Sequence, residues 1–183
     1  TAAIVFKTVV DPFIGKLTFV KVVAGKLTAD SPVINMRTGE QERMIKMYYM
    51  CGKKQEETKC ICAGDIGAIP KLQHTNTGDT LCSPTRKVVL EGVTYPEPVL
   101  SMAILPKQKG EEDKVAQGVL RLLEEDPTLK FVNNAETHQM ILSGLGEQHL
   151  DVVVSKLKGK FGLDVTLEKP KVAYRETIRK KVQ

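Results

Sequence analysis

Histidine and glycine residues with the spacing of a functional site lie in the stretch MILSGLGEQHLDVVVSKLKGKF at 140–161. An apolar run opens it, Gly144 and Gly146 follow, and His149 comes directly after them. Histidine changes charge near neutral pH and can therefore act as an acid or a base. Glycines permit a tight turn and leave backbone N–H groups uncovered. Acid–base catalysis, dinucleotide binding and protein contact are three functions that such a stretch can serve.

Catalysis by His149 has little support. The sequence places no serine, cysteine or carboxylate pair beside it to complete an acid–base or nucleophilic site. Partners brought in by folding stay an open alternative. We predict no catalytic residue in this chain.

A dinucleotide site is the second interpretation, because the glycines follow a strand pattern and open a helix, with Asp164 downstream. The third glycine of that fingerprint is replaced by His149, whose side chain would obstruct close packing of the helix on the strand. We therefore predict no cofactor-binding residue.

The second half of the stretch predicts a helix. Apolar residues recur at helical spacing: Leu150, Val153, Val154, Leu157 and Phe161. Lysines fill its last turns, where the negative end of the helix dipole favours them: Lys156, Lys158 and Lys160. His149 and Lys156 are about two turns apart and should share one side of this helix.

Metal binding is not predicted. The chain has four cysteines, of which Cys60 and Cys62 form a C-x-C pair without the two-residue gap that zinc ribbons prefer. No second pair with histidine follows at finger spacing. Reduced cysteines of this kind are typical of a cytoplasmic protein.

Glu124, Glu125 and Asp126 end a predicted helix, where the helix dipole disfavours negative charge. One interpretation is that a lysine or arginine from a neighbouring domain or partner compensates the cluster. The alternative is a solvated helix end that Pro127 terminates.

Short β-branched and aromatic runs, separated by turn signals, fill the first part of the chain. The predicted strands are 3–10, 16–23, 33–37, 43–50, 58–61, 66–72 and 80–82. No helical window lies between them. This spacing is typical of a closed or nearly closed β-barrel.

Prolines at 84, 96 and 98 mark a change of pattern. Beyond them we predict the order strand, helix, strand, strand, helix, strand of a ferredoxin-like split βαβ arrangement. The predicted elements are strand 100–105, helix 111–125, strands 129–133 and 138–143, the helix within 140–161, strand 163–167 and a further strand at 172–178. The predicted domains are a β-barrel at 1–83, a linker with a short strand (88–90) at 84–98, an α+β domain at 99–169 and the start of a further domain at 170–183.

The chain has 183 residues and a net charge of +5, with the basic excess in 1–83 and 170–183. Such an excess suits a polyanionic partner. Its apolar runs are too short to span a membrane, and no charged-then-apolar leader opens it. Because Thr1 is not a start methionine, we expect a piece of a longer protein.

Many short motifs occur together in a fixed order. They are DPFIG at 11–15 with KLTF at 16–19, AGD at 63–65, TGDT at 77–80, PEP at 96–98, EEDP at 124–127, SGLGEQHL at 143–150 and YRET at 174–177. In this order they resemble domains II and III of translation elongation factor G and the first strand of its domain IV. The resemblance covers essentially the whole chain.

The resemblance implies a ribosomal translocase driven by a GTPase domain that precedes this segment. No G-x-x-x-x-G-K-[ST] pattern occurs in the chain, so we expect GTP and Mg to bind only in the full-length protein and this segment not to be an enzyme. The family's domain II packs on the GTPase domain and touches small-subunit ribosomal RNA. Its domain III lies between the GTPase domain, domain V and a small-subunit ribosomal protein. A monomer without membrane contact is expected.

The resemblance also implies roles for residues. Contact between domains is expected at Gly144, Gly146, His149, Lys156, Glu124, Glu125 and Asp126, with a structural histidine as the alternative for His149. Contact with ribosomal RNA, by stacking and phosphate neutralisation, is expected at Phe13, Lys16, Lys53 and Lys54. The alternative for Phe13 is a hydrophobic plug at the barrel end.

Departures from the family pattern leave alternatives open. Leu145 and Gln148 stand where the family commonly has methionine and leucine, and Lys156 stands where arginine is frequent. Lysine cannot make the planar bidentate contacts of arginine. A divergent paralogue acting in ribosome recycling, or a ribosomal protection factor, is therefore the alternative function.

Overall fold

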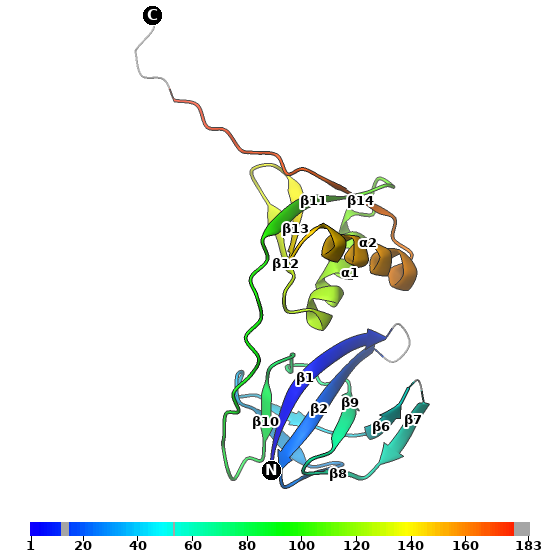
Figure 1. Ribbon diagram of the computed structural model, residues 1–183, viewed down its shortest axis with the longest axis vertical. Helices are drawn as coiled ribbons and strands as arrows, with labels where there is room; N and C mark the ends of the chain where they lie inside the picture. Colours follow the sequence, from blue (N-terminus) through cyan, green and yellow to red (C-terminus); the bar gives the residue numbers. More distant parts are fainter. Residues whose placement is uncertain (12–14, 53, 178–183) are drawn as a thin grey trace, which may run out of the picture. The chain divides into compact units, whose positions relative to one another are not determined.

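The computed structural model describes residues 1–11, 15–52 and 54–177. Its contacts divide the chain into two compact units, Thr1–Tyr95 with Arg121–Pro127, and Pro96–Leu120 with Thr128–Gln183. Helix α1 crosses this division and is described with the second unit, whose sheet it covers (Figure 1). The domain boundary at 84–98 stays a prediction. Two residues expected to contact RNA, Phe13 and Lys53, lie outside the described residues.

The first unit is built on an eight-stranded antiparallel sheet in the order β5-β4-β10-β1-β2-β9-β6-β7, with β3 and β8 paired separately. The strands are β1 (Ala2–Asp11), β2 (Gly15–Ala24), β3 (Lys26–Thr28), β4 (Pro32–Asn35), β5 (Gln41–Arg43), β6 (Met47–Cys51), β7 (Lys54–Thr58), β8 (Cys60–Cys62), β9 (Ile66–Pro70) and β10 (Thr80–Cys82). The sheet curls around one core (Figure 1). The predicted β-barrel class is confirmed.

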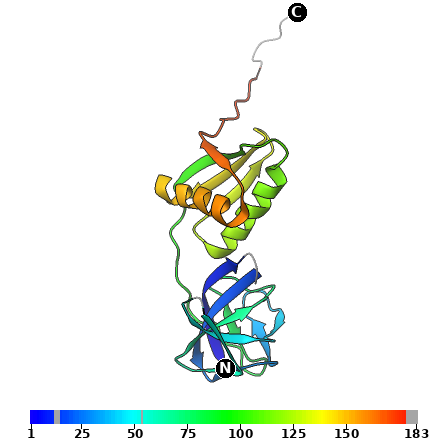
Figure 2. The same ribbon diagram turned by 90° about the vertical axis from the view of Figure 1, so that its right-hand side faces the viewer.

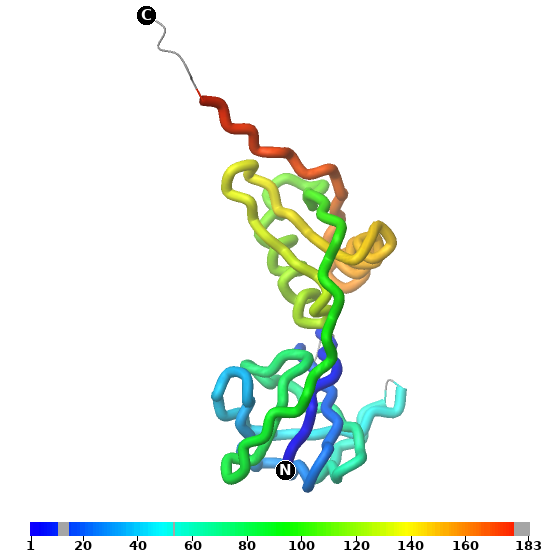
Figure 3. Tube along the Cα trace, turned by 60° about the vertical axis from the view of Figure 1, so that its left-hand side comes forward, coloured from blue at the N-terminus to red at the C-terminus, as the bar shows by residue number. Residues whose placement is uncertain are grey.

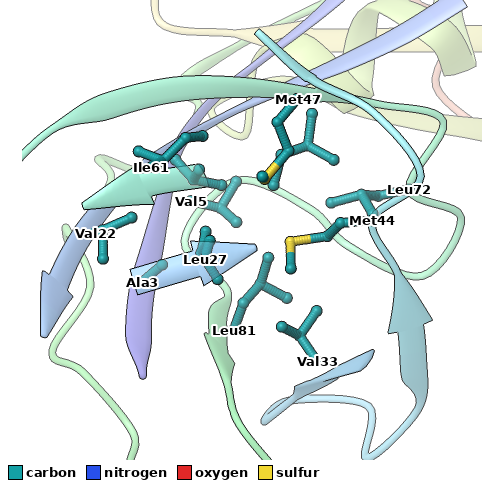
Figure 4. Close-up of a cluster of buried hydrophobic side chains, with 12 residues drawn as sticks. Ala3, Val5, Val22, Leu27, Val33, Met44, Met47, Ile61, Leu72 and Leu81 are labelled. Atoms are coloured by element: carbon teal, nitrogen blue, oxygen red, sulfur yellow. The ribbon is translucent and has the colours of Figure 1, made fainter. Parts of the chain in front are cut away.

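Alternate residues of the strands face this core, as the two-residue period of a strand requires. Val20 and Val22 of β2 are fully buried, whereas Lys21 between them is exposed. Figure 4 shows their neighbours in the core, among them Met44, Met47, Ile61 and Leu81. Complete burial of one such side chain contributes about 1.5–3 kcal/mol.

Three strand predictions in this unit are wrong. The strand expected at 43–50 is broken into β5 and β6, because Met44 turns into the core and its carbonyl accepts a hydrogen bond from Asp30 N at 2.7 Å. β7 covers Lys54–Thr58, whereas the sequence predicted a single strand here only at 58–61. The strand expected at 88–90 is absent from this described segment, since Leu90 N bonds the Thr80 side chain at 3.0 Å instead of a neighbouring strand.

The second unit has a four-stranded antiparallel sheet in the order β12-β13-β11-β14. Its elements are β11 (Leu100–Pro106), α1 (Glu112–Glu125), β12 (Lys130–Asn134), β13 (Gln139–Gly144), α2 (Glu147–Phe161) and β14 (Val165–Glu168). Both helices cover one face of the sheet (Figure 2). The predicted ferredoxin-like α+β class is confirmed.

One face of each helix packs against the sheet, and these faces form the core of this unit. Val115 and Val119 of α1 are fully buried, as are Leu150 and Leu157 of α2 and Leu142 of β13. The helical spacing of these residues in the sequence therefore identified the buried faces.

The strand expected at 172–178 is not formed over the described residues 172–177. Lys171 N donates to Gln139 Oε1 at 2.8 Å, and Arg175 pairs with Glu136. These are side-chain contacts, and within the described chain no strand pairs with this segment. A β-branched run does not make a strand without a partner to complete its backbone hydrogen bonds.

Candidate functional site

The turn between β13 and α2 is the centre of the expected site. β13 ends at Gly144, and Gly146 is the N-cap of α2 without a side-chain cap. Figure 3 shows the chain passing from the yellow hairpin of β12 and β13 into the orange helix α2. A shallow hollow over this helix start is lined by Leu145, Gly146, Glu147, Gln148 and His149.

His149 has a structural bond in this turn. Its Nδ1 accepts a hydrogen bond from Leu145 N at 3.1 Å. The half-buried His149 therefore stabilises the turn through this hydrogen bond.

The two glycines of the turn serve different purposes. A Cβ on Gly144 would lie 2.8 Å from Leu150 Cδ2 and 3.1 Å from His149 Nδ1, so the close packing of strand on helix requires glycine there. Gly146 has an extended φ of 170°, and no atom lies within 4 Å of the Cβ position. The position of Gly144 is thus closely packed, whereas the position of Gly146 has room for a side chain.

Lys156 lies about two turns beyond His149 and, like it, is half-buried. Val153 and Leu157, on either side of Lys156 along the helix, are buried in the core. Lys158 Nζ pairs with Asp164 Oδ1 at 3.0 Å near the end of α2. His149 and Lys156 are placed on one helix, whose position the core fixes.

The acidic cluster lies where the sequence indicated. Glu124 and Glu125 are in the last turn of α1, which contains no basic residue, and Asp126 N bonds Leu122 O at 3.0 Å. Glu124 and Glu125, with Asp126 directly after the helix, belong to the segment Arg121–Pro127 that groups with the first unit.

The expected RNA contacts within the described residues are not adjacent. Lys16 is at the start of β2 and its Nζ donates to Asn76 Oδ1 at 3.0 Å. Lys54 starts β7 and pairs with Glu56 at 2.9 Å. Strands β9 and β6 lie between β2 and β7 in the sheet, so the fold does not join these lysines into one patch.

A buried polar network in the first unit was missed by the analysis of the sequence. Asp79 is 4% exposed and accepts hydrogen bonds from Asn35 Nδ2 at 2.7 Å and from Asn76 N at 2.8 Å. Arg37 adds a bidentate pair, with Nε at 2.6 Å and Nη2 at 2.9 Å. The TGDT motif contains this aspartate, but its partners on β4 and beyond are more than forty residues away in the chain.

Glu42 holds the other end of the same loop. Its carboxylate accepts hydrogen bonds from Gln73 N and His74 N, both at 2.9 Å, and from Thr75 Oγ1 at 2.6 Å. In the loop between β9 and β10, buried Glu42 thus accepts from two successive backbone amides and buried Asp79 from the amide of Asn76. Their role is to fix this loop.

The pKa of Asp79 reflects this network. Burial alone would raise it, but the hydrogen bonds from Arg37, the Asn76 backbone and Asn35 outweigh burial and lower the pKa below 3.8. The hydrogen bond to Asp79 raises the pKa of Arg37 in turn. The pair is charged at neutral pH.

The free energy of unfolding of the first unit should fall in acid because of Asp79. A folded-state pKa below the unfolded one gives a stabilisation that is complete above the unfolded-state pKa and is lost as the pH falls through the lower folded-state pKa. Urea unfolding followed from neutral pH into acid measures this loss. Asp79→Asn should remove that part of the pH dependence, and an unchanged slope in this variant would contradict the assignment.

Among the described residues, no three histidine, cysteine or acidic side chains lie close enough together to hold a metal ion. Within the same residues, no helix has both the length and the apolar character to cross a membrane. Cys51 and Cys62 are exposed, Cys60 is half-buried and Cys82 is buried, all as free thiols.

Comparison with known proteins assigns the family. Residues 1–84 match the family model described as Elongation factor G domain 2, and residues 95–169 match Elongation Factor G, domain III. A crystal structure of a protein from Thermus thermophilus matches with a TM-score of 0.84 and 32% identity, over 98% of this chain and 27% of that one. The chain therefore spans about a quarter of that relative. It belongs to the elongation factor G family, of which it carries domain 2 followed by domain III.

Proposed function

We propose that this chain is the ribosome-binding and interdomain-coupling part of an elongation factor G-like translational GTPase that moves tRNA and mRNA through the ribosome. The observation that carries the proposal is the succession of domain 2 and domain III, in the family's order, over most of the chain. Its partners are small-subunit ribosomal RNA and protein, the GTPase domain and the later domains of the same chain. The protein acts as a monomer in the cytoplasm.

Helix α2 is the proposed relay between the GTPase domain and the ribosome. Leu150, Val153 and Leu157 are buried along its length, so the helix is packed as one rigid element. Gly144 packs the start of the helix closely against Leu150, and His149 and Lys156 are half-buried on one side of the helix. Small displacements of packed helices are a common element of conformational switches.

Two substitutions in the full-length factor test the relay. We expect His149→Ala and Lys156→Ala to slow single-round translocation by at least about fivefold, the lower end of typical coupling between sites. Affinity for nucleotide should be unchanged, because neither residue belongs to a phosphate-binding loop. Gln148→Ala, an exposed neighbour on the same helix, is the control.

A melting curve for each variant separates the relay from loss of fold. Polar truncations at such positions should change the free energy of unfolding by about 0.5 kcal/mol, and by up to about 1 kcal/mol for His149, which accepts the Leu145 bond. Translocation at the wild-type rate in both variants would refute the relay.

The isolated chain should bind neither GTP nor GDP, in the presence or absence of Mg. The reason is the lack of a G-x-x-x-x-G-K-[ST] loop, whose backbone amides hold the phosphates. Calorimetric titration measures binding, with the full-length factor as positive control. A specific site on the isolated chain would overturn the placement of GTP and Mg in the GTPase domain.

The acidic cluster at Glu124, Glu125 and Asp126 is proposed as a further interdomain contact, and Lys16 and Lys54 as contacts to ribosomal RNA. The departures at Leu145, Gln148 and Lys156 support a second candidate, a specialised paralogue in ribosome recycling or protection. A factor that splits ribosomes or expels an antibiotic, but does not translocate, would identify this second function.

A further inference from the structure

A hollow on the first unit combines positive charge with an aromatic and apolar wall. It has a volume of about 430 Å³, within the roughly 300–1,000 Å³ of ligand pockets. Its lining comes from β5, β6, β7, the end of β9 and the connections between them: Arg43, Ile45, Lys46, Tyr48, Gln55, Pro70 and Lys71. None of these residues was singled out by the analysis of the sequence.

Buried methionines hold one wall of the hollow in place. Met44 and Met47 are fully buried on either side of Ile45 and Lys46, and Asp30 N bonds Met44 O at 2.7 Å. Ile45 is thereby held outward with 70% of its surface exposed. Because neighbouring residues of a strand face opposite sides, burial of Met47 places Tyr48 on the outer face.

Lys71 forms the opposite wall in an unusual backbone conformation. Its φ is +62°, a region that residues with a Cβ rarely adopt. Its amide bonds Lys16 O at 2.9 Å, and the next residue, Leu72, is 2% exposed in the core. Glycine or asparagine would adopt this conformation more easily. The fold thus holds a lysine at the rim of the hollow in a backbone conformation that costs free energy.

The charges around the hollow are available to an anion. Arg43 pairs with Asp30 at 3.3 Å and Lys46 with Glu57 at 3.6 Å, and every one of these side chains is more than half exposed. Exposed pairs of this kind are weak and exchange partners readily. Lys71 forms no ion pair with any residue that the structure describes.

We propose that this hollow binds one unpaired nucleotide of a single-stranded RNA. Tyr48 supplies the stacking surface, and Ile45 and Pro70 supply apolar walls. Aromatic stacking together with a positively charged groove is the general mode of single-strand binding. Arg43, Lys46 and Lys71 neutralise the flanking phosphates, and the Gln55 amide can hydrogen-bond a base edge. An acidic peptide would use the cations but has no need of the aromatic wall.

Fluorescence anisotropy of a short labelled single-stranded RNA, titrated with the 183-residue chain, tests the site. Tyr48→Ala should weaken binding by about fivefold or more, and Tyr48→Phe should bind as the unaltered chain does because it keeps the ring. Lys71→Asn should weaken binding and lower the slope of log K against log salt by about 0.7. Asparagine tolerates the left-handed backbone, so this variant stays folded.

Lys109→Asn removes the same charge from an exposed loop of the second unit and should leave binding unchanged. Equal effects of Tyr48→Ala and Tyr48→Phe on the affinity for the RNA would overturn the nucleotide site. Binding of duplex RNA or of an acidic peptide as tightly as the single-stranded RNA would overturn it as well. Binding of vacant small ribosomal subunits is measured in parallel. Binding to subunits without binding to the oligonucleotide would refute the hollow and leave the proposed function standing.

Discussion

Asp79→Ala lowers the free energy of unfolding of the β-barrel unit by about 2–4 kcal/mol, the cost of leaving buried donors and a charged partner without their acceptor. Asn35 Nδ2 loses its shortest hydrogen bond at a buried position, and Asn76 N loses its bond to the carboxylate. Arg37 is half exposed and can be hydrated, so its share of the loss is smaller. The loop that Asp79 fixes should then open.

Glu40→Ala is the matched control, because Glu40 is an exposed carboxylate of the same unit. Its effect should be within about 0.5 kcal/mol. Urea unfolding gives the free energies, and hydrogen exchange at β1 and β10 assigns the loss to the barrel, since a chain of two units need not unfold in one step. Equal costs for the two substitutions would show that the buried network is not important for stability.

The second large effect on stability is expected from adding one methyl group, by substitution with alanine, at Gly144 but not at Gly146. Gly144→Ala should lower the free energy of unfolding by about 1–3 kcal/mol, because the new Cβ would lie 2.8 Å from Leu150 Cδ2. Gly146→Ala meets no atom within 4 Å and should lower it by less than about 1 kcal/mol. Gly146→Ser supplies a cap and should leave stability unchanged or raise it slightly.

Thermal unfolding of the second unit and hydrogen exchange in α2 measure both changes. The comparison separates packing from helix capping, since the substitutions are chemically identical at positions two residues apart. A larger loss at Gly146 than at Gly144 would contradict the packing argument and the geometry of the turn.

Local patterns predicted most of the architecture. β1 and β2 are ten-residue strands rich in β-branched and aromatic residues, and α2 has an apolar stripe that the structure buries. β7 could not be predicted in this way, because its sequence KQEET carries no apolar alternation and its hydrogen bonds to β6 define it. The break at Met44 depended likewise on the core and not on local preference.

The sites depended on contacts between distant parts of the chain. His149 and Gly144 are close in sequence, so their turn was identified, although its hydrogen bond to Leu145 was not. The Asp79 network and the hollow each join residues that the sheet order brings together, with β4 beside β10 for the network and β6 beside β9 for the hollow. Neither leaves a periodic signal in the sequence. Networks of this kind can be identified only from a structure.

The composition of β7 has a consequence for how the protein behaves at high concentration. β7 is the last strand of the sheet, and β5 is the strand at the opposite end. An edge strand offers unpaired backbone groups on which the strand of another molecule can add, which begins aggregation. Both edges are polar, with the sequences KQEET and QER, and their charged side chains oppose such addition. The sheet therefore keeps its two ends from acting as templates for fibrils.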